Sequence, residues 1–168
     1  MSASALFDIS TIDCCAVAVA ADEVGRLNPQ SGDMRMLDHV IWHSPDFKQL
    51  LGVRQARENE FWVPGHIPGR PLLPGVLMIE ASAQLASIAF RLRTNEARFL
   101  AFTRVDDLTF RAQVVPGDTL YLLCQEIRFQ PRRFQSRVQG LVDDHVAFEG
   151  TITGMVVNED QGRGKVEG

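Results

Sequence analysis

The chain has 168 residues, 45% of them hydrophobic, which is enough for one well-packed domain but short for two. Its net charge of −4 argues against general nucleic-acid binding. Cys14, Cys15 and Cys124 are an odd number of cysteines without Cys-x-x-Cys spacing. This pattern argues against a disulfide framework and a zinc motif, and favours a reducing, cytoplasmic location. Asp8 and Asp13 interrupt the N-terminal segment, so we expect no signal peptide.

The first predicted elements are two strands. Met34–Trp42 and roughly Leu50–Glu58 are rich in apolar residues and are separated by polar residues, so they predict a hairpin.

The next predicted element is one long helix. The run Leu72–Leu92 is nearly all apolar, and its length of about 20 residues would suit a membrane span. However, Glu80 and Gln84 lie in its middle and Pro74-Gly75 lies near its start, which makes a lipid-facing helix costly. A helix that is apolar on nearly all sides is typical of a protein core. We therefore predict a buried helix and no association with a membrane.

The remaining elements are strands joined by short turns. Valine, isoleucine, threonine and phenylalanine are frequent in them, and turn residues such as Pro116-Gly117 and Asp143-Asp144 separate them. We predict strands over Leu100–Val115, Asp118–Phe129, Phe134–Val142 and His145–Val157. One long helix inside a curled antiparallel sheet, an α+β fold, accommodates these elements. The polar tail 158–168 is predicted to be flexible.

The loop before the helix has the composition of a built site. Three prolines and three glycines lie within Gly65–Gly75 and give His66 a specified backbone path. A loop histidine is often structural, whereas a lone carboxylate in an apolar helix, Glu80, needs a partner or a function. The two residues are candidates for acid–base chemistry.

Three sequence blocks around this loop carry a resemblance. They are Asn59-Glu60-Phe61-Trp62, then Gly65-His66-x-Pro68-Gly69-Arg70-Pro71-x-x-Pro74-Gly75-Val76-Leu77, then Glu80-Ala81-x-Ala83-Gln84. Together with the turn Val114-Val115-Pro116-Gly117-Asp118, they resemble the β-hydroxyacyl-(acyl carrier protein) dehydratases of bacterial fatty-acid synthesis. The resemblance covers residues 28–157 and leaves residues 1–27 as an atypical N-terminal segment.

The resemblance implies a fold, an activity and partners. The fold is the hot-dog fold, in which a curled antiparallel sheet wraps a long central helix. The activity is dehydration of 3-hydroxyacyl thioesters to trans-2-enoyl thioesters, without a metal or cofactor. The partner is an acyl carrier protein with a phosphopantetheine-linked acyl chain. The assembly is a homodimer with active sites at the subunit interface, and a trimer of dimers stays open. Glutamate at position 80 matches the branch that dehydrates without isomerising the double bond.

The chemistry assigns a role to each residue of the site. Neutral imidazole makes His66 a general base for the C2 proton. A carboxyl group in an apolar environment is favoured in its protonated form, so Glu80 can give a proton to the departing hydroxyl. The resemblance places a glycine amide near the helix start on the thioester oxygen, and Gly75 is the expected donor. Gln84 lies one helical turn after Glu80 on the same face and is a candidate substrate-binding or orienting residue. The alternative is that it simply hydrogen-bonds Glu80 or the loop.

Several alternatives stay open. Arg132 and Arg133 either dock an acidic carrier protein or form an ordinary solvated hairpin end. A hot-dog thioesterase would cleave the thioester with a carboxylate and water, and would not need His66. A non-catalytic acyl-binding partner subunit would need neither His66 nor Glu80. Departures from the family pattern at Pro29-Gln30-Ser31, Arg104 and Gln113 leave the shape of the acyl tunnel and the higher assembly open.

Overall fold

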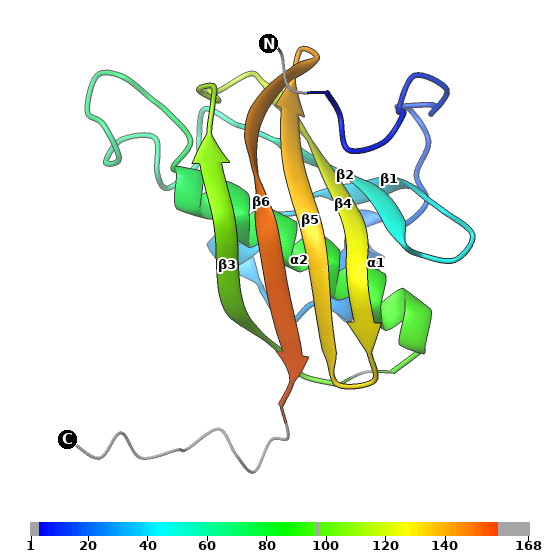
Figure 1. The fold of residues 1–168 in the computed structure, drawn as a ribbon. Coiled ribbons are helices and arrows are strands. Elements are labelled where there is room, and N and C mark those ends of the chain that lie inside the picture. Colours follow the sequence, from blue (N-terminus) through cyan, green and yellow to red (C-terminus); the bar gives the residue numbers. More distant parts are fainter. Residues whose placement is uncertain (1–3, 97, 158–168) are drawn as a thin grey trace, which may run out of the picture.

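One curled antiparallel sheet wraps around one long helix in the computed structural model, which describes residues 4–96 and 98–157 (Figure 1). The six strands are ordered β1-β2-β4-β5-β6-β3. The elements are α1 (Ala21–Leu27), a 3₁₀ turn (Gly32–Met34), β1 (His39–His43), β2 (Gln49–Gln55), α2 (Gly75–Thr94), β3 (Leu100–Phe110), β4 (Thr119–Gln130), β5 (Arg133–Val142) and β6 (His145–Val156). The architecture confirms the predicted α+β hot-dog fold, whereas the predicted flexible tail 158–168 lies outside the described residues.

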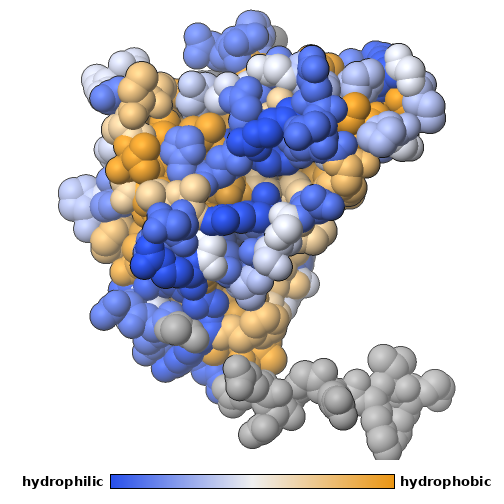
Figure 2. Space-filling model, turned by 180° about the vertical axis from the view of Figure 1, so that it is seen from behind, coloured by the Kyte–Doolittle hydropathy of each residue, from blue (hydrophilic) through white to orange (hydrophobic). Residues whose placement is uncertain are grey.

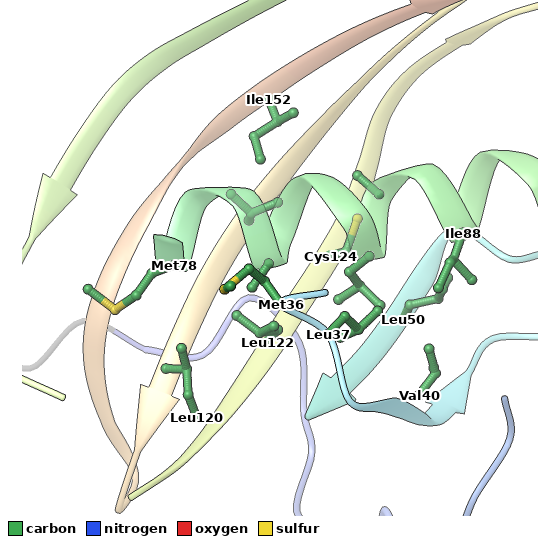
Figure 3. Packing of buried hydrophobic residues seen from close by; sticks show 14 of the residues in the cluster. Met36, Leu37, Val40, Leu50, Met78, Ile88, Leu120, Leu122, Cys124 and Ile152 are labelled. Atoms are coloured by element: carbon green, nitrogen blue, oxygen red, sulfur yellow. The ribbon is translucent and has the colours of Figure 1, made fainter. Parts of the chain in front are cut away.

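The core lies between α2 and the concave face of the sheet. Figure 3 shows this cluster, with Ile88 of α2 beside Leu50 of β2, and with Leu120, Leu122 and Cys124 on β4. All five side chains are buried. Strand residues alternate between the two faces of a sheet, so every second residue of β4 reaches this core. By length and composition α2 could cross a membrane, but more than half of its most apolar stretch is buried, as the prediction of a core helix requires.

The surface behind the sheet shows no broad apolar area. In Figure 2 hydrophobic patches alternate with wide hydrophilic areas over this face.

The predicted strand Met34–Trp42 is too long at its start. Only His39–His43 is a strand, and it pairs with β2. The backbone N–H groups of Met36 and Leu37 donate instead to the side chain of Gln84, at 3.0 and 3.2 Å. A side chain on α2 therefore takes the hydrogen bonds that a sheet ladder would have made. The other predicted strands and the helix are confirmed, with boundaries shifted by up to five residues. The largest shift is in the predicted strand Leu100–Val115, which ends at Phe110.

The N-terminal segment covers part of the convex face of the sheet. Leu6, Phe7, Ile9 and Ile12 pack against a second apolar cluster, which consists of Ile41, Leu51, Val53, Leu123, Leu141 and Val146. The N–H of Leu6 donates to the buried Gln139 side chain at 3.0 Å. The residues before α1 thus shield apolar side chains on the face opposite the core.

One edge of the sheet is open. β3 lies at the end of the strand order and pairs with β6 alone in the described part of the chain. Phe102 and Phe110 on this strand and Phe99 just before it are between 44% and 49% exposed. A long edge strand with exposed aromatic side chains is a surface on which a second chain can pair.

Candidate functional site

His66 lies in a loop that projects beyond the sheet between β2 and α2 (upper left in Figure 1). Its backbone N–H donates to the carbonyl of Trp62 at 2.9 Å. Its ring Nδ1 lies 2.8 Å from the carbonyl oxygen of Leu72. Because a carbonyl only accepts, Nδ1 carries the hydrogen, and Nε2 of the neutral ring is the unprotonated nitrogen. The loop therefore presents His66 as an exposed base.

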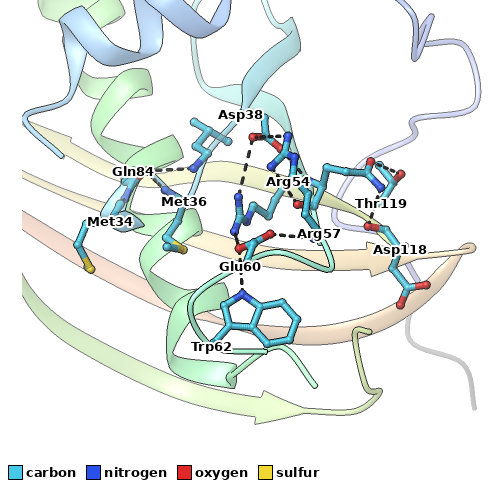
Figure 4. Close-up of polar contacts among 12 residues, drawn as sticks. Met34, Met36, Asp38, Arg54, Arg57, Glu60, Trp62, Gln84, Asp118 and Thr119 are labelled. Carbon is cyan, nitrogen blue, oxygen red and sulfur yellow. Dashed lines mark hydrogen bonds and ion pairs between the residues drawn. The ribbon is translucent and has the colours of Figure 1, made fainter. Parts of the chain in front are cut away.

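An ionic network holds the start of this loop (Figure 4). The buried Arg54 of β2 forms an ion pair with Glu60. Glu60 also accepts hydrogen bonds from the indole N–H of Trp62 at 2.9 Å and from the backbone N–H of Arg57 at 2.8 Å. Trp62 is the residue whose carbonyl holds His66. The network thereby connects the position of the imidazole to β2.

Glu80 lies in the second turn of α2 and is half-buried. Its Oε1 accepts two hydrogen bonds from side-chain amides, one from Gln84 Nε2 at 2.8 Å and one from Gln30 Nε2 at 3.1 Å. Oε2 is the oxygen left for other partners. The carboxyl group is therefore held in one orientation by two different parts of the chain.

Gln84 is the buried support of Glu80. Its Oε1 accepts the N–H groups of Met36 and Leu37, and its Nε2 donates to the Met34 carbonyl at 2.8 Å as well as to Glu80. These contacts fix the orientation of the amide, and Figure 4 shows Gln84 between Met34 and Met36. Gln84 does not line the cavity described below, so the structure places it behind Glu80.

Gly75 is the first residue of α2, directly after Pro74. The first intrahelical acceptor is the Pro74 carbonyl, which receives the N–H groups of Leu77 and Met78. The N–H of Gly75 precedes these bonds and has no partner within the helix. A Cβ at this position would lie 2.6 Å from the ring of Phe110, so a larger residue would have to displace that exposed side chain.

A mostly apolar cavity of about 330 Å³ begins at Glu80. It lies between α2 and the ends of β3, β5 and β6, and is lined by Pro29, Gln30, Glu80, Ala83, Ser87, Phe99, Leu100, Ala101, Phe102, Phe134, Ile152 and Gly154. His66 is not among the lining residues. Within one chain, the structure thus brings Glu80 and Gln30 together at an apolar cavity, with Gln84 behind Glu80, and leaves His66 outside it.

Arg132 and Arg133, the candidate residues for docking a carrier protein, lie at the tight turn between β4 and β5 and are exposed. Arg133 pairs with Gln130 across the hairpin, and the carbonyl of Arg132 accepts the N–H of Val156. This hairpin lies at the end of the sheet where β6 ends, away from the projecting loop (Figure 1).

Gln30 is a residue of the candidate site that is not predicted from the sequence. The sequence shows only that Pro29-Gln30-Ser31 departs from the family pattern at this point. The segment that carries it has no regular periodicity, and only the fold brings it against α2.

Comparison with protein families and known sequences gives a consistent result. Residues 28–152 match the model of the FabA-like domain. The 3-hydroxyacyl-[acyl-carrier-protein] dehydratase FabZ of Acetivibrio thermocellus is 36% identical over 131 residues, which cover 77% of this chain and 89% of that protein. The FabZ of Ralstonia nicotianae is 34% identical over 143 residues, covering 83% of this chain and 86% of that protein.

Solved structures share the fold at low sequence identity. The dehydratase heterocomplex ApeI:P of Xenorhabdus doucetiae has a TM-score of 0.70 at 17% identity, and covers 82% of this chain and 92% of its own. A mutant thioesterase PA1618 of Pseudomonas aeruginosa has a TM-score of 0.62 at 14% identity, with coverage of 83% and 95%. These likenesses concern the fold alone, which both activities use.

Proposed function

The chain belongs to the FabA-like family, and on that premise we propose that it is a dehydratase of fatty-acid synthesis. It converts 3-hydroxyacyl thioesters carried by an acyl carrier protein to trans-2-enoyl thioesters. His66 and Glu80 are its acid–base pair. The observation that carries the proposal is the arrangement at Glu80. A carboxyl group held by two amides opens onto an apolar cavity large enough for an acyl chain.

Each step of the reaction has a group suited to it. Nε2 of His66 takes the proton from C2 of the substrate, because Nδ1 is engaged by the Leu72 carbonyl. Negative charge develops on the thioester oxygen, where the N–H of Gly75 at the positive end of α2 stabilises it. Glu80 protonates the C3 hydroxyl as it leaves, so that water departs and the C2–C3 double bond forms.

The working pair is shared between two chains. His66 belongs to the projecting loop and does not line the cavity at Glu80 of its own chain. The open edge of β3 and its exposed aromatic residues suit antiparallel pairing with a second copy. In such a homodimer, His66 of one subunit serves Glu80 of the other, as in the arrangement that the family resemblance implies. A trimer of dimers is a further assembly that this pairing leaves possible.

The proposed dehydratase function also implies where the substrate binds and where the enzyme works. The acyl chain occupies the apolar cavity, and the phosphopantetheine arm of the carrier extends toward solvent. Arg132 and Arg133 attract the acidic carrier protein through their positive charge. The enzyme works in the cytoplasm, where its three cysteines stay reduced.

Product analysis tests the activity. The wild-type protein is incubated with 3-hydroxyacyl thioesters on carrier protein, and the products are identified by mass spectrometry. An enoyl thioester supports the proposal, whereas free acid and thiol would identify a thioesterase, and no product would indicate an acyl-binding protein.

Two substitutions test the proposed pair. His66→Ala and Glu80→Gln are each expected to lower the rate by about 10²–10⁴-fold, the usual contribution of a general acid or base. His145→Ala is the matched control, because His145 is also exposed and bonded to a backbone carbonyl, that of Asp143. A variant that keeps more than about a tenth of the wild-type rate would remove its residue from the mechanism.

A further inference from the structure

The orientation of three side chains determines which oxygen of Glu80 can carry a proton. The Gln84 amide has only one orientation that satisfies its contacts, because its Oε1 receives two backbone N–H groups. Its Nε2 must therefore be the atom that faces Glu80 Oε1, at 2.8 Å. A carboxyl oxygen that accepts N–H donors is not the one that bears the acidic hydrogen. The proton of Glu80 thus belongs on Oε2.

Gln30 adds a second donor to the same oxygen. Its Nε2 lies 3.1 Å from Glu80 Oε1 and approaches from the segment between α1 and the 3₁₀ turn, so it is independent of α2. Gln30 and Glu80 both line the apolar cavity. Of the two donors, Gln84 lies on the same helix as Glu80. Gln30 connects the carboxyl group to a different part of the fold.

The contact with Glu80 is the hydrogen bond that the described chain gives to the Gln30 side chain. Its Oε1 is buried and has no hydrogen-bond partner among the described residues. The Gln30 amide is thus directed at the proposed acid rather than at the backbone of its own segment.

We propose that Gln30 is a positioning residue that, together with Gln84, keeps the proton of Glu80 on Oε2, where it faces the substrate hydroxyl. The inference rests on the proposed dehydratase function. Without Gln30, one donor remains on Oε1, and the carboxyl group can rotate or place its proton on the wrong oxygen. The loss appears in turnover rather than in substrate binding, because Gln30 acts through Glu80.

The test compares three variants under steady-state conditions with a 3-hydroxyacyl thioester. Gln30→Met removes the amide at similar length and is expected to lower kcat about tenfold with KM within about twofold of wild type. Gln30→His restores an N–H donor and is expected to recover most of the rate. Gln49→Met is the matched control, since Gln49 is half-buried at the start of β2 and lies outside the cavity. Thermal unfolding of Gln30→Met is expected at or above the wild-type temperature.

The possible outcomes separate the two proposals. A wild-type protein that forms no enoyl thioester contradicts the proposed function itself. If wild type is active, three results each overturn the role of Gln30: an unchanged kcat in Gln30→Met, an equal loss in Gln30→Met and Gln30→His, or a loss confined to KM. A lower unfolding temperature in Gln30→Met together with reduced kcat would assign Gln30 a structural role instead.

Discussion

Replacement of Gln84 by leucine tests how the fold supports the site. Met36 and Leu37 are 1% and 0% exposed, and their N–H groups both donate to the Gln84 side chain. Leucine accepts no hydrogen bond, so both buried donors lose their acceptor. Each unsatisfied buried donor costs about 1–3 kcal/mol, which predicts a loss of about 2–6 kcal/mol in the free energy of unfolding. The Met34 carbonyl adds little, because Met34 is half exposed and water can reach it.

Thermal unfolding followed by circular dichroism measures this loss. In a protein of this size, 1 kcal/mol shifts Tm by roughly 2–4 °C, so Tm should fall by roughly 5–20 °C. Protein concentration is kept constant, since dimer formation also contributes to apparent stability. Gln49→Leu is the control and should stay within about 0.5 kcal/mol of wild type. A Gln84→Leu protein with an unchanged Tm would refute the view that Gln84 holds the segment before β1 onto α2.

Two further predictions concern the thiols and the arginines. Burial raises the pKa of the Cys124 thiol to about 12. In the native protein at pH 8 a thiol reagent should therefore label only Cys14 and Cys15, and Cys124 should react after denaturation. Rapid labelling of Cys124 in the native protein would show that the core opens. Reversal of Arg132 and Arg133 to glutamate should lower kcat/KM about tenfold with a carrier-linked substrate and spare a pantetheine thioester. An equal loss with both substrates would indicate a folding defect, and no loss would make the hairpin an ordinary solvated turn.

Most of the fold could be predicted because its elements carry local patterns. The apolar run around Glu80 predicts α2, and the period-2 strands between short turns predict the meander β4-β5-β6. The segment Met34–Leu37 could not be predicted correctly, because the backbone N–H groups of Met36 and Leu37 bond to Gln84, 48 and 47 residues later in the chain. The helix and strand propensities of neighbouring residues do not reveal a contact between segments so far apart in the chain.

The candidate residues His66 and Glu80 could be selected from the sequence because their surroundings are unusual for their residue types. A histidine in a loop rich in proline and glycine and a carboxylate in an apolar helix both stand out. Gln30 did not, since glutamine in a loop is ordinary and its meaning comes only from the 3.1 Å contact with Glu80. The packing of Leu6 and Phe7 on the convex face was also hidden, because the N-terminal segment has no regular apolar period.

The shared site is the central claim, and mixed dimers test it most directly. His66→Ala and Glu80→Gln chains are each expected to be inactive as homodimers. In a mixed dimer, one composite site receives both substitutions and the other receives neither. Co-expression in equal amounts makes about half of the dimers mixed, and each of these has one intact site out of two, so activity should return to roughly a quarter of wild type. Mixtures that contain heterodimers by mass spectrometry but stay as inactive as the separate variants would contradict a site built from His66 of one subunit and Glu80 of the other.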